Sequence, residues 1–124
     1  MQKIIKIIVI QIIIDIIYLK LSASHFNKVV NNIQGSNIKL NYYSVAIVYI
    51  LMAYALKKFI LDRSNSKNKI KDAFILGIII YGVFDFTNMS ILKNWNLYTS
   101  IMDMFWGGFL FAITIYIESK IKFI

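Results

Sequence analysis

Three of the six acidic residues, Asp15, Asp85 and Asp103, stand inside long apolar stretches of the sequence. An ionised carboxylate at the centre of a bilayer costs about 2.5–3.5 kcal/mol on insertion scales, so such acids face a protein interior and are candidates for function. Carboxyl groups accept hydrogen bonds, bind cations and exchange protons. The chemistry that these residues allow is binding or transfer of a proton, a cation or a polar ligand, or hydrogen bonding that only joins helices.

Each aspartate is accompanied by polar or aromatic side chains three or four positions away, which is the spacing of neighbours on one helix face. Helix rise puts all three aspartates roughly 20 Å from the cytoplasmic edge of a hydrocarbon core about 30 Å thick. Groups at a common depth on separate helices are expected to face one another. We therefore predict one interior polar cluster, made of Asp15, Tyr18, Tyr81, Asp85, Asn88, Asp103 and Trp106.

Helices of membrane-spanning length must position this cluster. A spanning helix needs roughly 20 mostly apolar residues, and the ranges 4–21, 42–61, 70–92 and 97–117 qualify. Barrel strands are about 9–11 residues long with alternating polarity, and these ranges are longer and do not alternate. We predict an all-α fold, a four-transmembrane-helix bundle that forms a single integral membrane domain over residues 1–124.

Small residues at helical spacing indicate where two of these helices pack. Ala73 and Gly77 are one turn apart in the third range, and Gly107 and Gly108 lie in the fourth. Membrane helices approach closely through such residues. We predict that another helix approaches closely at these four positions. Because only residues 93–96 separate the two ranges, we also predict that the third and fourth helices are antiparallel neighbours.

The segment 22–39 has the pattern of a short amphipathic helix. Its apolar residues from Phe26 to Ile33 follow the i, i+3, i+4, i+7 spacing of one helix face. Ser24 is placed to cap the start of this helix, and Gly35 to follow its end. We predict a separate surface helix between the first and second spans, over the outer mouth of the bundle, with an irregular polar loop as the alternative.

The N-terminal range also resembles a secretory signal peptide, because Lys3 and Lys6 precede an apolar run that ends in Ser22-Ala23-Ser24. Asp15 in the middle of that run argues against cleavage. We therefore interpret the range as a spanning helix.

The basic residues indicate the orientation, because cytoplasmic ends carry an excess of Lys and Arg. Of the 14 basic residues, the side with both termini and the second loop holds ten: Lys3, Lys6, Lys57, Lys58, Arg63, Lys67, Lys69, Lys71, Lys120 and Lys122. The other side holds four: Lys20, Lys28, Lys39 and Lys93. We predict cytoplasmic termini in a cell or inner membrane. The net charge of +8 is thereby explained without a nucleic-acid partner.

Composition excludes several kinds of site. The chain has no cysteine and one histidine, so it holds no disulfide scaffold, cysteine–zinc site, thiol nucleophile or centre built from several histidines. Apolar residues make up 59% and charged residues 16%, against about 45–50% and 25% in soluble domains. An ordinary soluble enzyme is therefore not expected, and we assign no catalytic residue, metal ligand or cofactor.

The order Gly77, Tyr81, Phe84-Asp85-Phe-Thr-Asn88, Trp95 and Asp103-Met-Phe-Trp106-Gly107 is distinctive. It resembles the family called domain of unknown function 2177, small predicted membrane proteins with a Tyr-x-x-Tyr-Asp-x-Thr-Asn core and an Asp-x-x-Trp-Gly motif. Asp15 and Phe26 also match, while Phe84, Tyr18 and Asn96 depart from the family pattern. The resemblance implies a four-helix membrane protein in which Asp15, Asp85, Asn88, Asp103 and Trp106 act as one unit, and it implies no activity.

We predict a multi-pass membrane protein whose acid cluster binds or conducts a proton, a cation or a small polar ligand, as in transport or a channel. One alternative is a lipid-active membrane enzyme with the aspartates as general acid and base. Others are an accessory or structural subunit of a membrane complex, or a cluster that only stabilises the bundle. A non-enzymatic role is favoured. The expected partners are the lipid bilayer and either a second copy of the chain or another membrane protein.

Overall fold

The computed structural model describes residues 2–63 and 67–121. Its elements are α1 (Gln2–Gln34), α2 (Tyr42–Leu56), the π-helical turn η1 (Lys57–Leu61), α3 (Lys69–Ile91) and α4 (Leu97–Lys120). No strand occurs in these ranges, so the prediction of an all-α fold is confirmed. Residues 64–66 of the second loop, and Lys122 from the charge count, lie outside the described residues.

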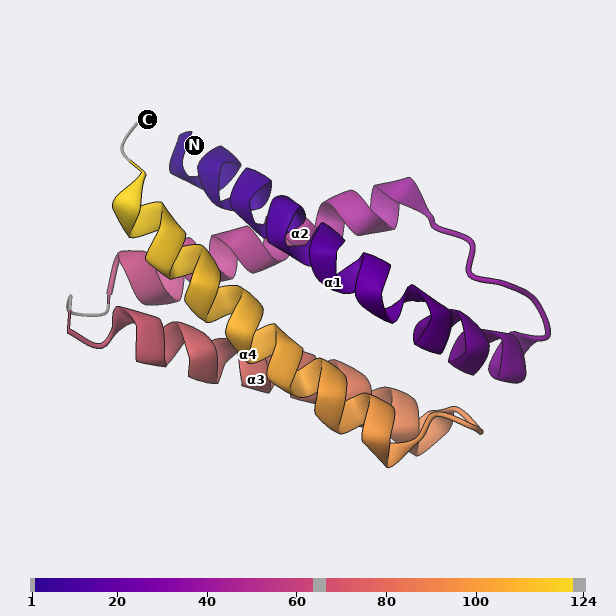
Figure 1. The fold of residues 1–124 in the computed structure, drawn as a ribbon. Coiled ribbons are helices and arrows are strands. Elements are labelled where there is room, and N and C mark those ends of the chain that lie inside the picture. The colour runs from indigo at the N-terminus through magenta and orange to yellow at the C-terminus, as the bar shows by residue number, and fades with distance from the viewer. Residues whose placement is uncertain (1, 64–66, 122–124) are drawn as a thin grey trace.

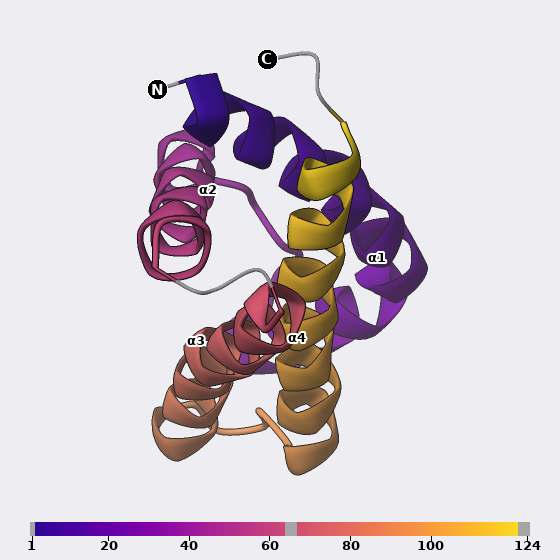
Figure 2. The same cartoon turned by 90° about the vertical axis from the view of Figure 1, so that its left-hand side faces the viewer.

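The helices run alternately up and down. In Figure 1 the start of α1, the end of α4 and the connection from η1 to α3 lie at one end, and the other two connections lie at the opposite end. Packing is most extensive between α3 and α4, while α1 packs on α4 and α2, and α3 meets η1. Figure 2 shows α2 and α3 on one side of the molecule and α1 on the other, with α4 between them.

Local signals fix the ends of these helices. Asn41 caps α2 by accepting a hydrogen bond from the Ser44 amide at 3.2 Å, and Asn96 caps α4 by accepting one from the Thr99 amide at 2.8 Å. Such side chains satisfy amides that have no partner within the helix. At the end of η1 the Lys57 amino group donates to the Asp62 carboxylate at 2.9 Å, and this bond lowers the pKa of Asp62.

The prediction of a separate surface helix is wrong in one respect. Residues 22–34 are helical, but they continue α1 without a break, and Ser24 lies inside the helix rather than at its start. No glycine or proline interrupts the chain there, and the Ser22 hydroxyl donates to the Tyr18 carbonyl at 2.7 Å, one turn back. The helix ends where expected, because Gly35 adopts φ +79°, which favours glycine.

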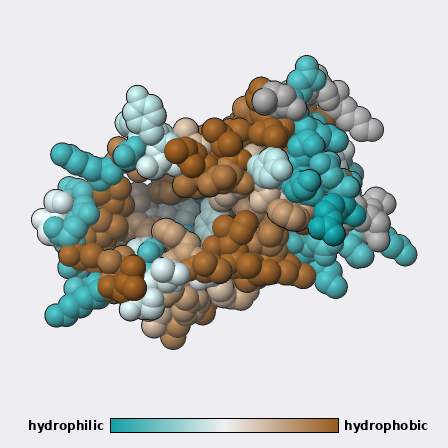
Figure 3. Space-filling model, turned by 180° about the vertical axis from the view of Figure 1, so that it is seen from behind, coloured by the Kyte–Doolittle hydropathy of each residue, from teal (hydrophilic) through white to brown (hydrophobic). Residues whose placement is uncertain are grey.

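The distribution of apolar and polar side chains differs from that of a soluble protein. Many large apolar side chains are exposed, among them Ile13, Val83 and Ile91, whereas Gln11 and Asp85 are completely buried. Figure 3 shows one face with apolar side chains across its middle and hydrophilic side chains gathered at both ends. A surface of this kind suits a hydrocarbon solvent bounded by two aqueous layers.

Within residues 2–63 and 67–121, three helices are long and apolar enough to cross a membrane. They are Tyr42–Leu61, Lys69–Ile91 and Leu97–Lys120, and they coincide within a few residues with the second, third and fourth predicted ranges. The first predicted range lies within α1, which is not among the three. The charged and amide side chains Lys6, Gln11 and Asp15 all lie within its apolar part and are buried.

Gly77 and Gly107 lie where α3 and α4 cross. A Cβ atom on Gly77 would overlap the carbonyl group of Gly107, and one on Gly107 would overlap the Tyr81 ring. Gly108 packs in the same way against Ile78 and Phe74, and Ala73 is completely buried one turn before Gly77. The predicted small residues therefore stand at a close approach of two helix backbones.

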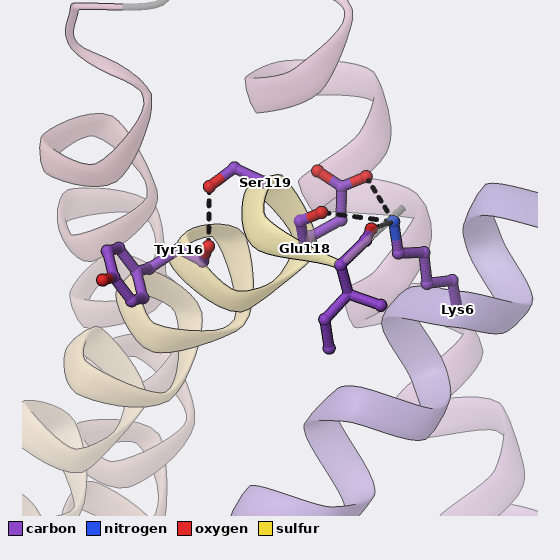
Figure 4. A network of polar contacts seen from close by, with 5 residues as sticks. Lys6, Tyr116, Glu118 and Ser119 are labelled. Carbon is purple, nitrogen blue, oxygen red and sulfur yellow. Dashed lines mark hydrogen bonds and ion pairs between the residues drawn. The ribbon is translucent and has the colours of Figure 1, made fainter. Parts of the chain in front are cut away.

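The end with both termini is held by a buried cation. Figure 4 shows the Lys6 amino group of α1 against the last turn of α4. It lies 3.4 Å from the Glu118 carboxylate and donates to the carbonyl oxygens of Glu118, at 3.2 Å, and Ile121. These carbonyls have no amide partner within the helix, and a positive charge is favourable at a helix C-terminus. The contact fixes α1 to α4.

We expect Gly77→Ala to lower the stability of the protein. The new methyl group meets backbone rather than a movable side chain, and overpacking of this kind costs about 1–3 kcal/mol. The measurement is thermal unfolding of the purified protein in detergent. The matched control is Gly82→Ala, whose methyl group would meet only the flexible Met104 side chain at 2.9 Å. Equal unfolding temperatures for the two variants would show that the crossing point is not tightly packed.

Candidate functional site

The Asp15 carboxylate joins three helices. It projects from α1, and its Oδ1 accepts a hydrogen bond from the indole Nε1 of Trp106 on α4 at 2.9 Å. Its Oδ2 accepts a second bond from the hydroxyl of Tyr49 on α2. The side chain is only 7% exposed. Two aromatic donors thus satisfy one oxygen each of a buried carboxyl group.

A second acidic centre lies beside the first. The Tyr18 hydroxyl, one turn from Asp15 on α1, donates to Asp103 Oδ1 of α4 at 3.0 Å. The Tyr18 ring is stacked on Trp106, with centroids 4.5 Å apart and planes 4° from parallel. Because Trp106 donates to Asp15 and Tyr18 donates to Asp103, the stacked rings connect the two carboxyl groups.

Asp85 of α3 completes the second centre. Its side chain is 0% exposed and lies within hydrogen-bonding reach of Asp103. Neither Asp85 oxygen has a donor among the described residues. The Ser100 hydroxyl donates to the Asp85 backbone carbonyl at 3.3 Å and itself accepts from Trp95 at 3.1 Å, which anchors the backbone without serving the carboxyl group.

A cavity of about 710 Å³ opens onto these groups. Its inner part is lined by residues of both acidic centres, and its outer part by the end of α1 and the segment after Gly35. A volume of 300–1,000 Å³ with apolar walls and a few polar groups is the usual form of a small-molecule site. The residues that line it include Asp15, Tyr18, Ser22, Phe26, Asn27, Ile38, Leu40, Tyr81, Phe84, Trp95, Asp103 and Trp106.

The sequence model of one family, described as "Predicted membrane protein (DUF2177)", matches residues 1–118. This chain belongs to that family. The resemblance drawn from the motif between Gly77 and Gly107 is thereby confirmed. No curated protein and no solved structure matches the chain.

In this DUF2177 member, most residues of the predicted cluster meet at the cavity. Asp15, Tyr18, Tyr81, Asp103 and Trp106 line it, and Asp85 stands directly behind Asp103.

Asn88 is the exception, because it does not line the cavity, and its carbonyl accepts the Leu92 amide at the end of α3. His25 forms a 2.8 Å hydrogen bond with Thr99 at the outer edge.

Sequence reasoning missed Tyr49. It is one of several tyrosines in α2, a helix that is apolar on every side, and no polar neighbour marks its face. Ser100 and Trp95 were also absent from the predicted cluster, although the family motif contains Trp95. The only sequence signal for Tyr49 is its position near the middle of a spanning range, where a phenol needs a partner.

The site has more acceptors than donors. Among the described residues, three aromatic donors serve Asp15 and Asp103, and none serves Asp85. The ion pairs Lys6–Glu118 and Lys57–Asp62 involve other acids. A carboxyl group buried without a donor or counter-charge is costly. In the part of the chain that the structure describes, no group of three or more His, Cys, Asp or Glu could hold a metal ion.

We expect Tyr49→Phe to destabilise the protein by about 1–3 kcal/mol, because it leaves one oxygen of a buried carboxylate without its donor. Thermal unfolding in detergent measures the change. Tyr54→Phe is the matched control, because Tyr54 lies on the same helix with its side chain 51% exposed. If the two variants unfold at the same temperature, the hydroxyl of Tyr49 does not support Asp15.

Proposed function

We propose that α1 also crosses the membrane, so that the protein has four spans with both termini in the cytoplasm. With 33 residues, α1 is roughly 50 Å long, and the hydrocarbon core is about 30 Å thick. Between Ile4 and Leu19 its exposed side chains are apolar, as in Ile5, Ile13 and Ile17, whereas the polar side chains Lys6, Gln11 and Asp15 are buried. The alternating direction of the helices in Figure 1 supports this topology.

Single cysteines test this topology, because the chain has no cysteine of its own. In intact cells, a membrane-impermeant maleimide is expected to label Ser36→Cys and Lys93→Cys but not Gln2→Cys or Asp62→Cys. All four positions are exposed. Labelling of the last two only after permeabilisation is the control. If Gln2→Cys and Ser36→Cys are accessible from the same side, α1 does not span.

We further propose that the acid cluster binds a cationic or donor-rich polar ligand within the membrane. The observation that carries this proposal is the buried Asp85 carboxyl group, which has no donor among the described residues and adjoins Asp103 at the 710 Å³ cavity. A proton, a small cation or an amine supplies the donor that Asp85 lacks. Tyr18, Tyr81 and Trp106 add aromatic surface, which attracts cations.

A lipid-active enzyme remains the second candidate. It requires a route from the lipid to the acids, and a smaller apolar hollow between α2 and α3, about 370 Å³ in volume, favours such a route. Asp85 and Asp103 would then act as acid and base on a bound lipid. Chemical conversion of a bound amphiphile would distinguish an enzyme from a protein that only binds its ligand.

The binding proposal is tested by titrating ethylammonium chloride against sodium chloride at matched ionic strength. With the background substitution Trp95→Phe, Trp106 is the only tryptophan left and reports on the cavity by its fluorescence. We expect saturable binding that Asp103→Asn weakens about tenfold or more, which corresponds to about 1.4 kcal/mol.

The control is Asp62→Asn, an exposed carboxyl near the opposite end. It is expected to leave the titration unchanged. If Asp103→Asn and Asp85→Asn fold normally and bind as the parent does, the proposal is wrong. If Asp103→Asn and Asp85→Asn both fail to assemble, the cluster only stabilises the bundle. If the parent protein itself shows no saturable binding of ethylammonium, the binding proposal is also wrong.

A further inference from the structure

A second hollow adjoins the first. It has a volume of about 370 Å³ and lies between Val48, Leu51 and Met52 of α2 and Ile80, Tyr81 and Phe84 of α3. Apart from the Tyr81 hydroxyl, these side chains are apolar. Figure 3 looks onto this side of the molecule and shows a hollow bordered by apolar side chains, with less apolar ones on its floor.

The two hollows share a wall. Tyr81 and Phe84 line both of them, and Tyr81 lies on the same face of α3 as Asp85, one turn away. The borders of the second hollow face lipid, because Val48, Leu51 and Phe84 are each at least 50% exposed. The second hollow therefore forms a path from the lipid as far as Tyr81 and Phe84, and these two side chains also line the cavity that contains Asp103.

The spacing of the helices keeps this path open. α3 meets the η1 turn at one end and packs along α4, whereas α2 packs mainly on α1 and has no extensive contact with α3. In Figure 2, α2 and α3 lie apart. A site for a water-soluble ion does not need an apolar opening through the side of the bundle.

From the chemistry of this path we propose the class of ligand. An amphiphile with a primary amine headgroup reaches the acid cluster from the lipid, between α2 and α3, and leaves its hydrocarbon chain in the apolar hollow. This inference rests on the proposed cation site at Asp85 and Asp103. The headgroup supplies the donors and positive charge that these acids lack, and the chain explains why the opening is apolar and lateral.

The same chemistry predicts which amphiphiles are rejected. A fatty acid of equal chain length brings a further negative charge to a cluster of three carboxyl groups, and like charges brought together in a binding site strongly disfavour binding. A short amine has the right headgroup but no chain for the hollow, so it binds more weakly than a long-chain amine.

The test uses a long-chain primary amine with a diazirine in its chain and an alkyne tag, mixed into phosphatidylcholine vesicles that contain the full chain. After irradiation, labelled peptides are mapped by mass spectrometry. We expect labelling at 48–52 and 80–84 to exceed labelling of other lipid-facing segments about tenfold. A fatty acid with the same chain and diazirine is expected to show no enrichment there.

A plug variant and its neighbour give the matched comparison. Val48→Trp fills the opening and is expected to remove the enrichment, whereas Ile47→Trp, on another face of α2 and also lipid-exposed, is expected to keep it. If Val48→Trp does not assemble, the comparison of amine and fatty acid on the unchanged protein still decides the outcome.

The results separate this inference from the proposed function. If ethylammonium binds at Trp106 but the long-chain amine is not enriched at 48–52 and 80–84, the lateral path is wrong and the cation site stands. Equal enrichment of the fatty acid overturns the ligand class. If neither amine binds, the cation site itself is wrong. If the amine but not the fatty acid is enriched at 48–52 and 80–84, and Val48→Trp removes this enrichment, the result supports both the cation site and the lateral path.

Discussion

The bond from Trp106 to Asp15, together with that from Tyr49, is the constraint on which the rest of the structure depends. Lipid is as apolar as leucine, so burial of apolar surface contributes little to bringing membrane helices together. Hydrogen bonds and close packing must do this instead. Asp15 receives donors from two other helices, and these bonds set the positions of α1, α2 and α4 around the cavity.

The helix pair α3 and α4 is built differently. Its contact depends on the absence of side chains at Gly77 and Gly107, which lets the backbones meet. This pair forms a compact half of the molecule, to which α1 is attached near its own start by Lys6 and farther along by Asp15 and Tyr18. The cavity occupies the space between this pair and the more loosely attached α1 and α2.

The helices were predictable because each is a long apolar range bounded by polar residues, and the glycine contact because small residues recur at helical spacing. The extent of α1 was not predictable from the same pattern. Ser24 is a residue type that often caps the start of a helix. A serine can also lie inside a helix and donate to the carbonyl one turn back, as Ser22 does to Tyr18, and the helix then continues. Only tertiary packing separates these outcomes.

The cluster shows the same limit. A common depth and helical spacing predicted one cluster because acids inside a membrane must face inward. Its members at the cavity or beside it are Asp15, Tyr18, Asp85, Asp103 and Trp106. Asn88 lies one turn beyond Asp85 on α3, but it does not line the cavity.

Tyr49 could not be found, because α2 has no polar face from which to read its orientation. The rotation of each helix about its axis decides which donor reaches which carboxyl group. The sequence of α2 has no polar pattern from which this rotation could be predicted.

The unbroken course of α1 has a mechanical consequence. The helix that carries Asp15 and Tyr18 extends without a hinge to Gln34, far past the depth of the acids. Its outer part contacts the α3–α4 connection through Asn32, whose carbonyl accepts a hydrogen bond from Asn94 at 3.2 Å. Because no break separates the outer part of α1 from Asp15, any change in the tilt of that outer part also changes the position of the Asp15 carboxyl group in the interior.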